Sequence, residues 1–590
     1  MKALRKVVFI LASRGGRVLV RRVLNKLIAS LRAGSHRRRR SREWKKATRL
    51  LTIADGLMLP SADVPEVSVI VPVFGGDRFT YSCLRAVAKH VDLAAEIIIV
   101  DDGSQDQTQR FLRSLNGVRC IRNDQSIGYF LSCNRGAAAA RGTFVCFLNN
   151  DTIVQQHWLS ELVKRAKTDA DIGAVGSKLL YPNRAIASAG GIIWRDGSGC
   201  SFGRGRAEDD PACAYPRDVD YCSSASLLVD RRQFLELGGF EGRYAGAYHE
   251  DAAFSVVLRG RGLRAVFEPR SVVMHFGSPA AAIGRETVID QSQRDNCERF
   301  ADKFSAELEA HYSSESRNAA RAARRLSGHP RILVIDRFVP FADRDAGSLR
   351  LLNLLILLRG LHCDLTFYPD EGIAHEPHAQ RLRDHGIEVL GKTQNSSAHR
   401  QLRERRGMFD IAWLCRPDIT AHFAPSLRQQ DCRIWYDTVD LHFVRLQRQE
   451  QVTARATGWR RTQKMELSLA RSADATIVTS PTEADLLVSE NVRHVHVIPP
   501  VYTRSQTIVP WAERSGLLFI GNYIHEPNVD AALHLAIEIF PALSRAIPGL
   551  QLTLAGNEPP LVLLRLQSAA IIVPGHLDTL APCLERARVF

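Results

Sequence analysis

The sequence predicts an α/β protein with several sheet-containing domains, and three observations lead to this prediction. The chain has 590 residues, which is too long for one hydrophobic core and corresponds to three or four domains of about 150 residues each. Its composition, 45% hydrophobic and 24% charged, is that of an ordinary globular protein. Short apolar runs typical of buried strands alternate with helical stretches, which favours mostly parallel sheets covered by helices on both faces.

The net charge of +16 is concentrated at the start of the chain. Residues 1–60 contain 17 Lys and Arg against two acidic residues, Glu43 and Asp55, so the rest of the chain is close to neutral. This excludes a basic nucleic-acid-binding surface spread over the body of the chain, and we expect no nucleic-acid partner. The basic segment is compatible with a solvated helix and a flexible stretch, or with an amphipathic segment lying on an anionic membrane.

The cysteines and the first residues indicate the compartment. The twelve cysteines are scattered singly, without the spacing of a zinc site or of a disulfide framework. Residues 1–12 imitate a signal peptide, but their apolar run is short and leads directly into Arg14 and Arg17. No stretch reaches the roughly 18–20 continuous apolar residues that span a bilayer. We therefore expect a cytoplasmic protein, with peripheral binding to the inner membrane face through residues 1–60 as an open alternative.

The first series of elements begins at Pro65. Its predicted strands are residues 67–74, 96–100, 118–122 and 143–148, and an Ala-rich stretch near 134–140 predicts a helix. In a parallel sheet covered on both faces, ligands lie beyond the carboxyl ends of the strands. The sequence places Asp101, Asp102 and Asp151 at these ends.

Two further series follow. Residues 281–328 are polar, charged and helical in pattern, and they predict a connector. A second α/β series spans residues 329–505 and a third begins at residue 506. The strands predicted for the two series are residues 331–336, 411–415, 434–437, 475–479, 496–498, 516–521, 550–556 and 571–573.

Two familiar motifs occur in contexts that do not support them. Residues 386–393 have the P-loop spelling, but residues 387–390 look like a strand, whereas a P-loop is a turn that follows a strand. Residues 199–203 spell the hydrolase elbow G-x-S-x-G. No apolar strand precedes them and no clear helix follows, which predicts a loop.

Phe74 and the pair Asp101-Asp102 close two neighbouring predicted strands. The sequence Asp-Asp-Gly-Ser at 101–104 is compatible with a simple capped turn, and an aromatic residue that closes a strand is compatible with the core. Together these residues also allow a second interpretation, in which the aromatic face stacks on a base and a carboxylate accepts a hydrogen bond from the base.

Asn149, Asn150 and Asp151 close another apolar strand. They are suited to capping the turn that follows. Alternatively, oxygen ligands at this position suit Mg²⁺ or Mn²⁺, which would also hold a diphosphate. A metal ion there would neutralise the charge on a leaving diphosphate.

Asp251 and His275 complete the set of candidate residues. Asp251 begins an apolar helical pattern, where an acidic residue stabilises the helix by about 0.3–1 kcal/mol, but it also suits the role of a general base. His275 follows the predicted strand 270–274, and it has either a structural role or that of a metal ligand or phosphate contact.

The order of these motifs resembles that of family-2 glycosyltransferases of the GT-A fold. The likeness covers about residues 66–280 and is closest to the bacterial rhamnosyltransferase-like branch, as the stretches at 128–136, 148–152 and 238–240 suggest. The resemblance implies an inverting transfer from a nucleotide-diphosphate sugar, with dTDP-rhamnose or a UDP-sugar as donor. The implied acceptor is a growing cell-surface polysaccharide, such as O-antigen, or a lipid-linked glycan.

The resemblance also implies roles for individual residues. Phe74 would stack on the base and Asp102 would recognise it, Asp151 would bind the divalent cation, and Asp251 would deprotonate the acceptor hydroxyl. The other residues placed at the donor are Pro72, Asp101, Asn134, Asn149 and Asn150. The family's Asp-x-Asp motif is Asn149-x-Asp151 here, which removes one charge from the metal site.

Residues 329–590 resemble family-4 glycosyltransferases of the GT-B type, which have two Rossmann-like domains. The matching stretches are residues 340–350, 436–442, 497–500 and 519–530. The basic residue and glutamates with which that family grips its donor lie beyond a strand that begins near Arg586. We therefore expect a GT-A domain, a first GT-B domain at 329–505 and an incomplete second GT-B domain at 506–590.

Two other classes of function stay open. A non-catalytic polysaccharide-assembly scaffold is favoured if Asp151 and Asp251 do not share one site. A sugar nucleotidyltransferase uses similar carboxylates, but it would carry a Gly-rich, basic phosphate-binding loop after its first strand. The loop at 75–79 has a single basic residue, Arg78.

Overall fold

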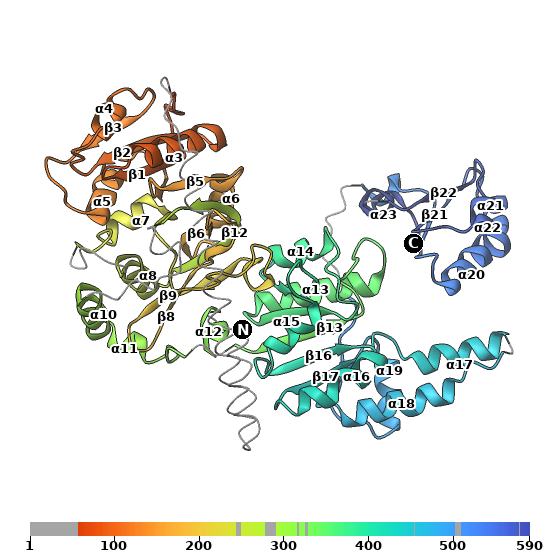
Figure 1. The fold of residues 1–590 in the computed structure, drawn as a ribbon. Coiled ribbons are helices and arrows are strands. Elements are labelled where there is room, and N and C mark those ends of the chain that lie inside the picture. The colour runs from red at the N-terminus through yellow and green to blue at the C-terminus, as the bar shows by residue number, and fades with distance from the viewer. Residues whose placement is uncertain are drawn as a thin grey trace, which may run out of the picture. The chain divides into compact units, whose positions relative to one another are not determined.

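The structure is a computed structural model (Figure 1) in which the chain forms two compact units, residues 1–327 and 328–590. The residues that the structure describes are 57–242, 249–277, 291–315, 318–324, 329–453, 455–501, 509–577 and 579–590. The basic segment predicted to meet a membrane lies almost wholly outside this set. Within it, no helix combines the length and the apolar composition needed to cross a bilayer.

The first unit is a mixed sheet with helices on both faces. Its strands are β1 (Val67–Val73), β2 (Ala95–Asp101), β3 (Arg119–Arg122), β4 (Phe144–Leu148), β5 (Thr152–Val154), β6 (Ile172–Leu180), β7 (Ile186–Ser188), β8 (Gly191–Ile193), β9 (Gly199–Ser201), β10 (Arg217–Val219), β11 (Ser226–Asp230) and β12 (Arg264–His275). Its helices are α3 (Asp77–His90), α4 (Thr108–Arg113), α5 (Tyr129–Ala139), α6 (Trp158–Ala166), α7 (Arg231–Glu236), α8 (Glu250–Gly260), α10 (Gln291–Lys303), α11 (Ser305–Leu308) and α12 (Ala319–Ala322).

Among the described residues, the main sheet has ten strands, eight of which follow the order β10-β12-β6-β11-β4-β1-β2-β3. Strands β4, β1, β2 and β3 are parallel, which confirms the strands predicted for this region. Strand β11 runs antiparallel to both β4 and β6, whereas β6 and β12 are again parallel, so the sheet is mixed. The carboxyl ends of β1, β2 and β4 therefore meet at one edge.

Helices cover both faces of this sheet because the parallel strands are apolar on both sides. On one face, buried residues of α3 and α6 pack on Val69, Val71 and Leu148. On the other face, buried residues of α5, α7 and α8 pack on Ile70 and Phe147. This burial is what favours a run such as Val67–Val73, in which every residue is buried.

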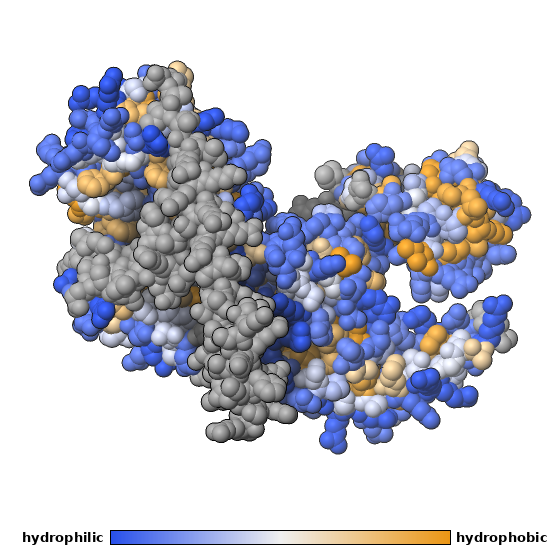
Figure 2. Space-filling view, viewed as in Figure 1, coloured by the Kyte–Doolittle hydropathy of each residue, from blue (hydrophilic) through white to orange (hydrophobic). Residues whose placement is uncertain are grey.

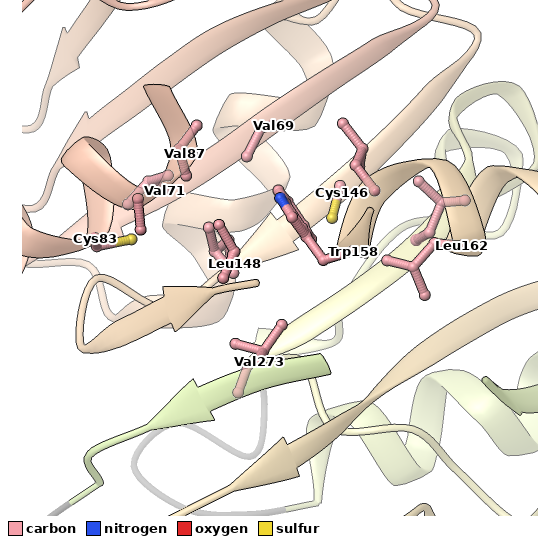
Figure 3. Close-up of a cluster of buried hydrophobic side chains, with 14 of the residues drawn as sticks. Val69, Val71, Cys83, Val87, Cys146, Leu148, Trp158, Leu162 and Val273 are labelled. Atoms are coloured by element: carbon pink, nitrogen blue, oxygen red, sulfur yellow. The ribbon is translucent and has the colours of Figure 1, made fainter. Parts of the chain in front are cut away.

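Trp158 occupies the centre of the first of these cores (Figure 3). It begins α6, whose apolar positions 158, 159, 162 and 163 recur with the spacing of one helix face and are all buried. The indole ring lies between α3, the strand residues Val69 and Cys146, and Val273 of β12. This core therefore joins the parallel strands β1 and β4 to β12, which comes much later in the chain.

Helices of the predicted connector pack against α8. One buried cluster contains Ala252 and Val256 of α8 together with three residues of the connector: Phe300 of α10, Phe304 just before α11, and Leu308 of α11. Residues 199–201, which the sequence predicts as a loop, form strand β9 and pair with β8. The sequence did not predict this hairpin because β9 lacks an apolar run. Its pairing with β8 is what defines it as a strand.

The second unit contains two all-parallel sheets. Its strands are β13 (Arg331–Asp336), β14 (Asp364–Pro369), β15 (Glu388–Val389), β16 (Ile411–Cys415), β17 (Arg433–Asp437), β18 (Ala475–Val478), β19 (Val495–Val497), β20 (Leu517–Ile520), β21 (Leu552–Ala555) and β22 (Ile571–Gly575). Its helices are α13 (Ala346–Gly360), α14 (His378–Asp384), α15 (Ala398–Glu404), α16 (Pro417–Arg428), α17 (His442–Thr453), α18 (Trp459–Ser472), α19 (Pro481–Ser489), α20 (Glu526–His534), α21 (Phe540–Ala546), α22 (Leu561–Leu564) and α23 (Ala581–Arg586).

The larger of these sheets has the order β15-β14-β13-β16-β17-β18-β19. The strand order reverses between β13 and β16, as it does in doubly wound nucleotide-binding folds. A buried ion pair lies at the end of β17. Arg350 Nη1 is 2.9 Å from Asp437 Oδ2, and Trp413 Nε1 donates to the same oxygen at 3.0 Å.

The smaller sheet has the order β20-β21-β22, and Val589 adds a parallel bridge to Leu517 beside β20. This bridge lies in the stretch where the sequence predicts a further strand, beginning near Arg586. Apolar side chains of α22 and of the segment before α21 remain exposed, for example Leu561 at 71% and Ile537 at 53%. Figure 2 shows hydrophobic residues gathered over this part of the chain.

We expect Trp158→Ala to destabilise the first unit by about 3–5 kcal/mol, because it removes a completely buried indole from the core. The measurement is the urea midpoint of the transition assigned to this unit. Phe74→Ala is the matched control, since 69% of Phe74 is exposed, and it should change stability by less than about 0.5 kcal/mol. Equal effects of the two substitutions would contradict this account of the core.

Candidate active site at the carboxyl edge of the first sheet

Loops bring the candidate residues of the first unit together at one sheet edge. β1 pairs with β2 and β4 in parallel register, so Phe74, Asp102 and Asn149 leave their strands at the same side. The backbone N–H of Gly75 donates to Ser104 Oγ at 2.9 Å, and Asn150 Nδ2 donates to the carbonyl of Gly75 at 3.4 Å. The ends of all three strands are thereby linked by hydrogen bonds.

The predicted base-stacking residue is accessible. Phe74 follows β1 directly and exposes 69% of its surface, which is unusual for an aromatic residue at the end of a buried strand. Pro72, two residues earlier, is buried within β1. The predicted roles of both residues at a donor stay predictions, and the exposure of the Phe74 ring is compatible with stacking.

Asp102 is a buried carboxylate that accepts five hydrogen bonds. Its donors are Asn123 Nδ2 at 2.7 Å, Ser126 Oγ at 2.6 Å, Ile127 N at 2.9 Å, Gly128 N at 3.0 Å and Ser132 Oγ at 3.0 Å. Burial would raise the pKa of Asp102, but these hydrogen bonds hold it below its usual value. The carboxylate therefore stays ionised and fixes the segment 123–132 against the end of β2.

Asp101 and Gly103 complete this turn. Asp101 forms an ion pair with Arg122 at the end of β3 and accepts from the backbone N–H of Ser104 at 2.9 Å. Gly103 has φ +79°, and a Cβ there would approach the backbone of Gln125 to 3.1 Å. Glycine is thus required both by conformation and by the close approach of the segment that Asp102 holds.

Asn134 connects α5 to the turn before residue 241. Its Nδ2 donates to the carbonyl of Phe240 at 2.8 Å, and its Oδ1 accepts from the backbone N–H of Phe240 at 2.9 Å. The side-chain amide of Asn150 similarly donates to Thr80 Oγ1 at 3.0 Å. Donor binding by these amides stays a prediction, since both already have partners in the protein.

Asn149, Asp151 and His275 meet where β4 ends and β12 ends. His275 Nε2 lies 3.2 Å from Asp151 Oδ1 and 3.3 Å from Asn149 Nδ2. Burial raises the pKa of Asp151, but the neighbouring His275, together with backbone N–H groups, outweighs this effect and lowers the pKa. Conversely, Asp151 raises the pKa of His275 against the effect of burial. The structure therefore brings together the residues that the sequence predicts for a metal site.

The chemistry of this group fits a divalent cation that shares its ligands with a substrate. Asn149 Oδ1 is buried and has no hydrogen-bond partner among the described residues, so an oxygen ligand is left over beside the Asp151 carboxylate. The described part of the chain contains no group of three or more His, Cys, Asp or Glu side chains arranged for a metal ion. Mg²⁺ in particular is usually held by one or two carboxylates together with substrate phosphates.

Asp251 lies at the start of α8 and is 9% exposed. Its carboxylate accepts from the backbone N–H of Ala252 at 2.9 Å and from that of Ser224 at 3.4 Å. Burial raises the pKa of Asp251 to about 7, and these two N–H groups only partly offset the effect. Burial likewise raises the pKa of the adjacent Glu250 to about 7, so two neighbouring carboxyl groups both have a pKa near neutrality.

The segment between β10 and β11 connects Asp251 to the donor side of the site. The backbone N–H of Asn149 donates to the carbonyl of Ala225 at 3.1 Å, and the neighbouring Ser224 holds Asp251. The hydroxyl of Tyr129 donates to the carbonyl of Ser224 at 3.0 Å. The sequence offers no signal for Ser224 or Ala225, because their contribution is made by the backbone.

Comparison with protein families identifies the domain that carries this edge. Residues 68–184 match the family model described as Glycosyl transferase family 2. The matched region contains Phe74, Asp102 and Asp151, whereas Asp251 and His275 lie beyond it. Part of the first unit, residues 68–184, is therefore similar to family 2 glycosyltransferases.

Curated relatives support the same assignment. Over 264 residues, 42% of this chain, the chain is 28% identical to the O-antigen biosynthesis protein RfbC of Myxococcus xanthus and covers 20% of that protein. Over 135 residues, 22% of this chain, it is 28% identical to the glycosyltransferase AglE of Haloferax volcanii and covers 44% of that protein. The chain thus spans less than half the length of either relative.

A solved structure with a partial likeness is that of GalNAc-T7 with UDP, GalNAc and Mn²⁺. The sequence identity is 16%, the TM-score is 0.35, and the alignment covers 42% of this chain and 49% of that chain. A TM-score this low does not establish a shared fold.

Asp102→Asn should destabilise the segment 123–132, because one side-chain oxygen becomes an N–H₂ group that faces donors. We expect a loss of about 1–3 kcal/mol and faster amide hydrogen exchange at Ile127 and Gly128. Hydrogen exchange read by mass spectrometry measures this change. The exposed Asp124→Asn is the matched control and should leave the exchange unchanged.

Proposed function

We propose that the first unit transfers a glycosyl group from a nucleotide-diphosphate sugar to a hydroxyl of a glycan or lipid-linked acceptor, with inversion at the anomeric carbon. The observation that carries this proposal is that the segment with Ser224 and Ala225 connects two carboxyl groups of unlike pKa, Asp151 beside the end of β4 and Asp251 at the start of α8. Asp151 is an ionised group beside a free amide oxygen, and Asp251 is a buried group with a pKa near 7. The family 2 match of residues 68–184 supports the reaction class.

Asp251 is the residue suited to act as the general base. A base with a pKa near the working pH combines a useful ionised fraction with sufficient basicity, and burial supplies this pKa here. It would take the proton from the acceptor hydroxyl as that oxygen attacks the sugar. A single direct displacement of this kind inverts the anomeric configuration.

The donor would lie over the ends of β1, β2 and β4. The exposed ring of Phe74 would stack on the base, and the segment fixed by Asp102 would form the neighbouring wall. Asp151, with Asn149 and His275 beside it, would hold Mg²⁺ or Mn²⁺. The cation, when bound, neutralises charge on the leaving diphosphate.

The likeness to the O-antigen biosynthesis protein motivates the choice of acceptor, a cell-surface polysaccharide or its lipid-linked precursor. We propose dTDP-rhamnose and UDP-sugars as the donors to be tried first. For the second unit we propose a GT-B-type role, because the strand orders of both its sheets begin with the reversal expected for Rossmann-like domains.

A donor screen on the purified chain tests the proposed function. Release of nucleoside diphosphate would be scored for dTDP- and UDP-sugars with Mn²⁺, with Mg²⁺ and with chelator, in the presence of polysaccharide or polyprenyl-diphosphate-linked acceptors. Donor-specific release that depends on acceptor supports glycosyl transfer. Binding of polysaccharide without release of diphosphate from any donor would favour the assembly-scaffold alternative, and formation of a nucleotide sugar would favour a nucleotidyltransferase.

Asp251→Asn should lower kcat by roughly 10²–10⁴-fold while leaving the donor dissociation constant almost unchanged, because it removes the base but keeps its shape. In the unsubstituted protein, kcat/KM should rise with pH up to about 7 and then level off, since only the ionised Asp251 accepts a proton. Initial rates across pH 5.5–9 measure both effects. Near-normal turnover by this variant would show that another group takes the proton.

Asp151→Asn should raise the Mn²⁺ concentration needed for half-maximal rate by about 10–100-fold, because the remaining carboxylate of the proposed metal site is lost. The metal titration is carried out at fixed donor concentration. Asp124→Asn keeps the same change of charge on an exposed residue and should leave the titration unchanged. An unaltered metal requirement in Asp151→Asn would contradict the proposed cation site.

A further inference from the structure

We propose that Tyr129 is a positioning residue for Asp251 and acts through the backbone of Ser224. This inference rests on the proposed function, because it assigns to Asp251 the role of general base. It adds a residue that neither the family match nor the sequence motifs assign to the reaction. In this proposal Tyr129 does not contact the reacting atoms. It binds Ser224, whose N–H is, among the described residues, the backbone group outside α8 that donates to Asp251.

The contacts form a continuous path from α5 to α8. The Tyr129 hydroxyl donates to the carbonyl of Ser224 at 3.0 Å, and the backbone N–H of Ser224 donates to Asp251 Oδ2 at 3.4 Å. The next residue, Ala225, accepts from the backbone N–H of Asn149 at 3.1 Å. Movement at Ser224 is therefore transmitted to the base on one side and to the proposed metal site on the other.

Tyr129 is well held for this task. It is the first residue of α5, and its ring packs edge-on against Phe130 with centroids 5.0 Å apart. The preceding residue, Gly128, donates its backbone N–H to Asp102 at 3.0 Å. The position of the hydroxyl is thus fixed by the same buried carboxylate that shapes the proposed donor side.

The groups facing Asp251 explain why one backbone N–H matters. The titratable groups near Asp251 are Glu250 on the same helix and Tyr221, Cys222 and Tyr129 from other elements, and none of them is a cation. Among the described residues no cation forms an ion pair with Asp251, so backbone N–H groups provide its compensation. Loss of the Ser224 contact would keep Asp251 protonated to higher pH.

The test compares Tyr129→Phe with Tyr81→Phe in the full chain. Tyr129→Phe keeps the ring and removes the hydroxyl, whereas Tyr81 is a buried tyrosine of α3 whose hydroxyl has no hydrogen-bond partner among the described residues. We expect Tyr129→Phe to lower kcat at pH 7 by about fivefold, to leave the donor KM unchanged, and to move the acid limb of kcat/KM to higher pH by about one unit. Activity should recover near pH 9, and Tyr81→Phe should match the unsubstituted protein throughout.

Two outcomes would overturn the inference. A loss of rate that is equal at every pH would indicate a merely structural role, and an unchanged pH profile would show that the hydroxyl does not act on Asp251. Failure of the proposed function is distinguishable, because the unsubstituted protein would then release no nucleoside diphosphate from any donor. In that case the melting temperature decides. Between about pH 4 and pH 7, Asp251 is protonated in the folded protein but ionised in the unfolded chain, so the stability of the fold decreases as the pH rises through this range. Tyr129→Phe must extend this fall to higher pH.

Discussion

A buried carboxylate must be compensated by donors or lose its charge, and this constraint organises the first unit of the protein. Asp102 satisfies it with five hydrogen bonds and thereby fixes ten residues of chain against the end of β2. Arg122 compensates Asp101 in the same turn. Because unpairing such a group is costly, the edge at which the parallel strands end is rigid before any ligand arrives.

Asp251 meets the same constraint in the opposite way. It is buried with two backbone donors and without an ion-pair partner among the described residues, so burial moves its pKa to about 7. Asp151 keeps its charge beside His275, at the far side of the segment that carries Ser224 and Ala225. Two carboxyl groups thus differ because their surroundings differ: the pKa of Asp151 is lowered, whereas the pKa of Asp251 is raised to about 7.

The antiparallel strand β11 makes this separation possible. It lies between β4 and β6. The segment that precedes it contacts the end of β4 through Ala225 and the start of α8 through Ser224. A single backbone stretch therefore touches both carboxylate sites, and Tyr129 on α5 holds that stretch from a third element. Chemistry at the edge depends on packing between elements that are distant in sequence, since residues 129, 149, 224 and 251 converge there.

The sequence by itself determined the parallel strands and the residues at their ends. Runs such as Val67–Val73 are apolar at every position, and such runs have few stable structures other than a buried strand. It did not reveal β6, in which Gly173, Gly176 and Lys178 interrupt the pattern, because pairing with β11 and β12 defines that strand. It also did not reveal that Asp102 is held by five donors whereas Asp251 has two backbone donors. Only the tertiary structure decided this difference, because the number of donors around a buried carboxylate depends on which distant segments fold against it.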